Sequence, residues 1–202
     1  WRNKFYKYSW YRIKGRINMQ YDTLTPLITR LNDFLDSLIR DFKEYKLDEE
    51  TIVFLSEKTR NFINFTELSL FNVVLKVLEN IDNVKYAFDD EIKLINKMIE
   101  KIFEKLNESL NNILVHEDEE EHVHGHDHDH VHYHVDVENV QKDIDKIIEY
   151  LVFLKKILGS LGNVILSLLK YQNKEISEEE FNKEYTTFKE NINNYKNEFA
   201  DL

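Results

Sequence analysis

The chain has 202 residues, enough for one domain with a hydrophobic core, and its 42% hydrophobic and 32% charged residues exclude a disordered protein. It has no cysteine, which excludes disulfides and thiolate metal sites, and its one proline and four glycines favour long helices over tight turns. Residues 1–21 carry six cations and no acid, whereas the other 21 cations face 38 acids, so a segment of charge +6 precedes a body of charge −17.

The first expected element is a basic and aromatic N-terminal arm, residues 1–22, which contains both tryptophans of the protein. Its cations can neutralise phosphates and its rings can stack on bases, so it is a candidate nucleic-acid-binding segment. The candidate binding residues are Arg2, Lys4, Lys7, Trp10, Tyr11, Arg12, Lys14 and Arg16. Two alternatives stay open: a tail that docks on the acidic body, and an interfacial membrane helix, although the arm has no segregated apolar face.

Residues 23–202 are predicted to form a single helical-bundle domain. Its first helix is expected to have Thr25 as N-cap and Pro26 as first residue, and to reach about residue 46. The apolar residues of this segment recur every three or four positions, as on one face of a helix: Leu27, Leu31, Phe34, Leu35, Leu38 and Phe42.

Two shorter helices are expected next, over 48–64 and 66–82, divided by a cap signal at Phe65 and Thr66. Their apolar residues are dense, which places both helices in the interior. A longer helix is expected over 85–114. Its apolar face is formed by Ile92, Ile95, Ile99, Ile102, Leu106, Leu110 and Ile113.

The most regular pattern begins at Val140, where apolar residues alternate four- and three-residue steps as in a heptad repeat. They are Val140, Ile144, Ile147, Leu151, Leu154, Leu158, Leu161, Ile165 and Leu168. Gly159 and Gly162 in this helix indicate a bend or a close helix contact. The uncharged stretch 157–169 is shorter than the roughly 20 residues that span a bilayer, so no membrane crossing is expected. Core packing is its expected role, with lipid or a neighbouring subunit as the alternative contact.

The last helix has a clear start signal. Ser177 and Glu180 have the spacing of a capping box, and Ile176 and Phe181 that of a hydrophobic staple. An aromatic face follows: Phe181, Tyr185, Phe188, Ile192, Tyr195 and Phe199. Taken together, the segments predict an all-α helical bundle with two charged appendages.

The second appendage is a histidine-rich insertion, residues 116–137, expected to form a β-hairpin or loop between two helices. Its alternating histidines would lie on one face of an extended chain. They are the candidate metal ligands: His122, His124, His126, His128, His130, His132 and His134. Imidazoles flanked by carboxylates suit Zn²⁺ or Ni²⁺, although the fold is expected to require no cofactor. Incidental chelation, metal buffering or metal-dependent assembly, and a pH-responsive surface all remain open.

The pattern does not predict an enzyme or a small-molecule substrate. The sequence shows no glycine-rich phosphate loop, no paired His-Glu zinc motif and no Ser/His/Asp set, because all eight histidines lie in one tract. The expected class is therefore a non-enzymatic binding or structural protein.

A cation- and aromatic-rich arm over residues 1–21, followed by an acidic helical bundle over 25–200, resembles the major capsid proteins of filamentous archaeal viruses, the lipothrixviruses and rudiviruses. The resemblance implies a virion protein that coats double-stranded DNA and associates with itself or a paralogous subunit in a filament. It also implies lipid contact if the virion has an envelope. The histidine tract departs from this pattern. The alternatives are a metal-binding or metal-buffering helical protein in the cytoplasm, and a helical protein-interaction module.

Overall fold

The computed structural model describes residues 25–44, 48–79, 86–116, 133–134 and 140–200. These residues form five helices and a pair of two-residue strands. The helices are residues 25–44, α2 (Glu49–Glu79), α3 (Asp89–Ile113), α4 (Gln141–Gln172) and α5 (Glu178–Ala200), and the strands are β1 (Val115–His116) and β2 (Tyr133–His134). The all-α class predicted from the sequence is therefore confirmed for this part of the chain, whereas the arm and the histidine insertion lie outside it.

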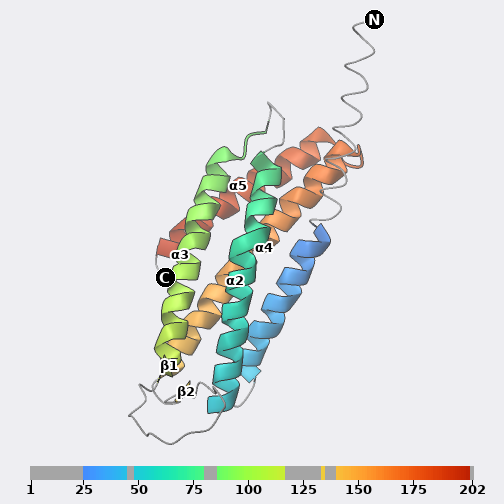
Figure 1. The fold of residues 1–202 in the computed structure, drawn as a ribbon. Coiled ribbons are helices and arrows are strands. Elements are labelled where there is room, and N and C mark those ends of the chain that lie inside the picture. Colours follow the sequence, from blue (N-terminus) through green and yellow to red (C-terminus); the bar gives the residue numbers. More distant parts are fainter. Residues whose placement is uncertain (1–24, 45–47, 80–85, 117–132, 135–139, 201–202) are drawn as a thin grey trace, which may run out of the picture.

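The helices lie side by side in an elongated bundle, with α4 and α5 behind α2 and α3 in the view of Figure 1. α3 packs against α2, α4 and α5, and α4 also packs against α5. Helix 25–44 contacts α2 through stacked rings of Phe34 and Phe62, whose centroids are 5.1 Å apart. It contacts α4 through an ion pair between Asp36 and Lys155.

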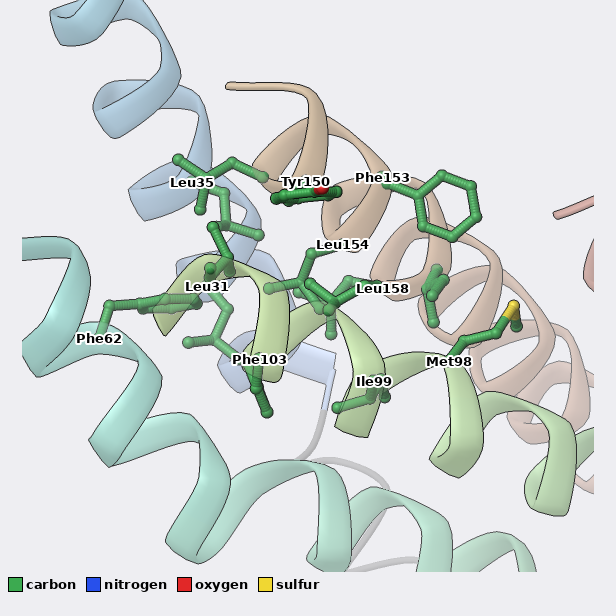
Figure 2. Close-up of a cluster of buried hydrophobic side chains, with 14 of the residues drawn as sticks. Leu31, Leu35, Phe62, Met98, Ile99, Phe103, Tyr150, Phe153, Leu154 and Leu158 are labelled. Atoms are coloured by element: carbon green, nitrogen blue, oxygen red, sulfur yellow. The ribbon is translucent and has the colours of Figure 1, made fainter. Parts of the chain in front are cut away.

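One buried apolar cluster joins the helices. Figure 2 shows side chains of helix 25–44, α2, α3 and α4 meeting at its centre, among them Leu31, Phe62, Phe103 and Leu154. All nine heptad positions of the α4 segment, from Val140 to Leu168, are buried. The seven apolar positions expected on α3 are buried as well, so these two faces were correctly predicted.

α5 begins with the predicted capping box. The Ser177 backbone N–H donates to Glu180 Oε2 at 2.7 Å, and the Glu180 N–H donates to Ser177 Oγ at 3.2 Å. The backbone hydrogen bond, assisted by the side-chain bond, lowers the pKa of the Glu180 carboxyl from its ordinary value. Phe181 is fully buried and Ile176 packs against the core, as the staple requires.

The connection from α4 to α5 is a tight turn. Lys174 has a φ of 62°, in the left-handed region that favours glycine. Its N–H donates to the Tyr171 carbonyl at 3.0 Å, and the Glu175 N–H donates to the Lys170 carbonyl at 2.8 Å. These two bonds are those of a Schellman C-cap, with lysine where glycine is usual.

The expected division of α2 is wrong. The helix is continuous through Phe65 and Thr66, instead of forming two helices over 48–64 and 66–82. A threonine cap favours a helix start by only about 1 kcal/mol, whereas a break would leave several backbone groups without helical partners. The backbone hydrogen bonds of a continuous helix therefore outweigh the free energy of a local cap inside an otherwise helical sequence.

The two α4 glycines differ. A Cβ added to Gly162 would lie 3.2 Å from Ile28 Cγ2, so this glycine permits the close helix contact predicted from the sequence. A Cβ on Gly159 would meet nothing within 4 Å, so no such contact exists there.

Candidate functional site

Almost all the residues assigned a function from the sequence lie outside the described part of the chain. This applies to every arm candidate, namely Arg2, Lys4, Lys7, Trp10, Tyr11, Arg12, Lys14 and Arg16, and to the histidines from His122 to His132. His134 belongs to β2, but its side chain is likewise outside the description. The structure nevertheless describes where both appendages join the bundle.

The arm enters the bundle at Thr25. One turn later, Ile28 lies against Gly162 of α4. Gly162 is 21 residues beyond Gln141, the first residue of α4. At 1.5 Å per residue, that separation corresponds to about 32 Å along the helix. The arm therefore joins the bundle far from the beginning of α4.

The histidine tract joins at the other end. β1 begins two residues after the end of α3, and the Asn112 side chain donates to Asp143 Oδ1 at 3.2 Å, so the end of α3 adjoins the start of α4. β1 and β2 pair antiparallel, with Val115 opposite His134, and so hold the two ends of the 117–132 segment together. The start of helix 25–44 and the β1–β2 pair therefore lie far apart along the bundle (Figure 1).

An apolar groove lies between helix 25–44 and α2, with a volume of about 580 Å³. Its first lining residue, Leu27, is two positions after the point where the arm enters. Phe54 is 63% exposed beside it, which corrects the expectation that this segment is wholly interior. The lining consists of Leu27, Arg30, Leu31, Phe34, Phe54, Glu57, Lys58, Asn61 and Phe62.

Three charged side chains line the groove. Lys58 donates to Asp41 at 3.4 Å and lies 5.4 Å from the centroid of the Phe34 ring. Arg30 and Glu57 are more peripheral, and no ion pair links either of them to another described residue. The groove is thus an aromatic floor with a mixed-charge rim. Such a surface suits a bulky apolar or aromatic group better than a small polar ligand.

An ion pair between a buried carboxylate and a partly exposed lysine lies where α5 packs on α3. Glu91 is 7% exposed, and its Oε1 lies 3.3 Å from Lys189 Nζ. Lys189 also donates to the Tyr185 hydroxyl at 3.4 Å and lies 5.1 Å from the centroid of that ring. Burial acts to lower the pKa of Lys189, but the Tyr185 hydrogen bond and the Glu91 charge outweigh it and raise that pKa.

Around this pair is a cluster of rings from the start of α3, the end of α4 and the start of α5. Tyr86 makes edge-to-face contacts with Phe181 and Tyr185, with centroids 4.7 and 5.2 Å apart. Burial, followed by the neighbouring Tyr171 and Tyr185, raises the pKa of the Tyr86 phenol. The Tyr86 hydroxyl and Glu91 Oε2 are buried without a hydrogen-bond partner. We interpret the cluster as a structural contact between α3 and α5.

α4 is the one described helix long and apolar enough, by length and composition, to cross a membrane. The prediction of no membrane crossing counted only the uncharged residues 157–169. If up to two charged residues are allowed, an 18-residue stretch of α4 is apolar enough to span a bilayer. In the bundle, 56% of that stretch is buried. The central helix of a helical bundle has the same composition, so this property alone is weak support for lipid contact.

Among the described side chains, no three His, Asp or Glu residues are grouped to hold a metal ion. The histidine candidates are not among those side chains. The chain matches no family model, and searches of curated proteins and of solved structures found no match. Its function is therefore inferred from its own residues and geometry.

Proposed function

We propose that this protein is a structural nucleic-acid-packaging protein that coats double-stranded DNA through its basic arm. The observation that carries the proposal is the separation of the two appendages. The arm, with six cations and no acid, joins the bundle about 32 Å from the end at which the acidic histidine tract leaves.

This separation matters because the acidic charge is concentrated in the tract. Residues 117–138 contain nine acids and neither lysine nor arginine, more than half of the −17 carried by the body. The Debye length is about 10 Å at 0.1 M salt, so charges held at the two junctions, about 32 Å apart, interact only weakly. A polyanion held at the junction of the arm would therefore feel little repulsion from charges held at the junction of the tract.

Assembly into a filament is the second part of the proposal. The architecture of a basic arm on an acidic helical bundle resembles the capsid proteins of filamentous archaeal viruses, which supports a virion location and association with identical or paralogous subunits. The apolar α4 would be the lipid-facing element if that filament has an envelope.

A binding titration tests the DNA claim. Two unrelated fluorescent duplexes are titrated with the intact protein and with a variant lacking residues 1–22, and circular dichroism verifies that both are helical. We expect similar binding of the two duplexes by the intact protein, because phosphate contacts carry little sequence information, and none by the variant. Equal binding by both proteins contradicts the proposal. Negative-stain imaging with and without DNA tests filament formation.

The β1–β2 ladder favours metal binding by the histidine tract as a second candidate function. The ladder pairs the residues on either side of the 117–132 segment, so this segment begins and ends beside the junction of α3 and α4. We expect weak, multi-site Zn²⁺ or Ni²⁺ binding by calorimetry. Replacing 117–132 with a short Gly/Ser linker should abolish that binding and preserve the helical signal. Unfolding on deletion or on addition of a chelator would instead indicate a structural metal site.

A further inference from the structure

The groove between helix 25–44 and α2 has an unusual combination of features for a monomer surface. The stacked Phe34 and Phe62 rings form its floor, and Phe54 stands 63% exposed at its side. Isolated exposed apolar residues are common on proteins, but a concave aromatic surface of about 580 Å³ is typical of a binding site. Aromatic rings prefer edge-to-face or offset contacts with other rings, so this surface favours an aromatic occupant.

We propose that the occupant is the N-terminal arm of the same chain, with the Trp10 ring packed in the groove. The arm enters the bundle at Thr25, two residues before Leu27, the first residue of the lining. It carries six aromatic residues within its first eleven: Trp1, Phe5, Tyr6, Tyr8, Trp10 and Tyr11. An aromatic segment is thus tethered at the mouth of an aromatic groove.

The tether is long enough for this docking. The floor at Phe34 is nine residues along the helix from Thr25, or about 14 Å. The fifteen residue steps from Trp10 to Thr25 span about 22 Å as a helix and at most about 50 Å when extended, in both cases more than the distance to the floor. Trp10 therefore reaches the floor once the chain reverses direction before Thr25. A short tether also gives the arm an effective concentration of the order of millimolar, which favours its own groove over that of a neighbouring copy.

The charges of the groove indicate that the contact is made by rings rather than by cations. Arg30 and Lys58 outnumber the one acid of its rim, Glu57, and Lys58 is already engaged with Asp41. These cations would repel the lysines and arginines of the arm but can lie over the face of a docked aromatic ring. Docking therefore leaves the arm cations in solvent.

The consequence goes beyond the proposed function, because it concerns the protein without nucleic acid. Trp10 in the groove and the covalent link at Thr25 fix both ends of the segment between them. Arg12, Lys14 and Arg16 then form a short cationic loop on the bundle surface instead of a free tail. Fixing this loop in advance reduces the entropy lost when its cations bind a polyanion.

The two tryptophans, both in the arm, provide the test. In Trp1→Phe, all tryptophan emission comes from Trp10. In the absence of nucleic acid, we expect this emission to be shifted to shorter wavelength and protected from acrylamide quenching, relative to a synthetic peptide of residues 1–22 with the same Trp1→Phe change. Adding Phe54→Asp should abolish both effects. Adding Leu166→Asp, which changes the 40% exposed leucine of α4, should leave both unchanged.

Three results would overturn the proposal. The first is a Trp10 as exposed as that of the peptide. The second is equal protection with and without Phe54→Asp in a protein that remains helical by circular dichroism. The third is protection that disappears on dilution, which would assign the groove to the arm of a neighbouring copy. The fluorescence test contains no DNA, so its outcome is independent of the DNA titration. If Trp10 is exposed but duplex binding still requires the arm, docking is refuted and the proposed function is not.

Discussion

α4 and α5 pack against each other but are held in place by different forces. Fourteen of the 32 residues of α4 are buried, and its polar contacts are exposed apart from a part-buried one between the Ser160 and Tyr195 hydroxyls. Only three of the 23 residues of α5 are buried. α5 instead depends on a capping box, an ion pair between Lys189 and Glu91, and aromatic contacts. The comparison teaches that apolar burial fixes α4 along its whole length, whereas α5 is fixed by a few identifiable contacts.

The largest effect is expected from a truncation in α4. Leu154 is completely buried at the centre of the cluster in Figure 2. Leu154→Ala should lower the free energy of unfolding by about 2–5 kcal/mol, through lost burial and the cavity left behind. Chemical denaturation measures the change. Leu166→Ala, on the exposed side of the same helix, should cost only about 0.5 kcal/mol. Equal costs at the two positions would refute the central place of α4.

A smaller loss is expected where α5 meets α3. Lys189→Ala removes the partner of Glu91 Oε1, and Glu91 Oε2 already has none. The buried carboxylate would be left uncompensated, at a cost of about 1–3 kcal/mol. Adding Glu91→Gln should recover part of the loss, because the amide carries no charge. A double-mutant cycle measures the coupling. No coupling between the two substitutions would show that the pair does not hold α5.

The start of α5 should contribute less. Ser177→Ala removes the acceptor of the Glu180 N–H and should lower stability by about 1 kcal/mol. Ser177→Asp retains an acceptor at the same position and should restore most of the loss. The unfolding midpoints of the two variants measure the loss and its recovery. An unchanged midpoint in a helical Ser177→Ala protein would mean that the cap makes no net contribution.

The end of α4 offers a stabilising change. Lys174 holds a left-handed conformation that costs a residue with a Cβ about 1 kcal/mol, whereas glycine adopts it freely. Lys174→Gly should therefore raise stability, although by less than about 1 kcal/mol, since glycine also gains freedom in the unfolded chain. Thermal unfolding detects the shift. Destabilisation would show that the turn depends on the lysine side chain.

Two kinds of sequence signal explain why most of the fold was predictable. The heptad positions of α4 and the capping box of α5 each combine local spacing with tertiary burial, and both signals favour the same structure. In α2 local spacing and tertiary structure disagree, because the cap signal at Thr66 predicts a helix start whereas the helix is continuous through that residue. The Glu91–Lys189 pair was missed, although its signal is present. Glu91 and Lys189 carry opposite charges, and each lies next in sequence to a buried apolar residue, Ile92 in α3 and Phe188 in α5.

The groove was not predictable for a different reason. Phe54 has Glu57, Lys58 and Asn61 three, four and seven residues further on, so periodicity places it on a polar face of α2, and the groove arises only from how helix 25–44 packs beside that face. Periodicity identifies which face of a helix is apolar but not how much of that face another helix covers. The binding residues of the arm and the histidine tract stay predictions.

The salt dependence of DNA binding by intact protein and variants tests the central claim most directly. If all six arm cations neutralise phosphates, log K against log salt should have a slope of about −5, at roughly −0.9 per phosphate. Arg12→Gln, Lys14→Gln and Arg16→Gln together should flatten the slope by about three units. The matched control, Lys93→Gln, Lys97→Gln and Lys101→Gln, removes three exposed cations from α3 and should leave the slope unchanged. Equal slopes for the arm variant and the intact protein would contradict DNA binding through the arm.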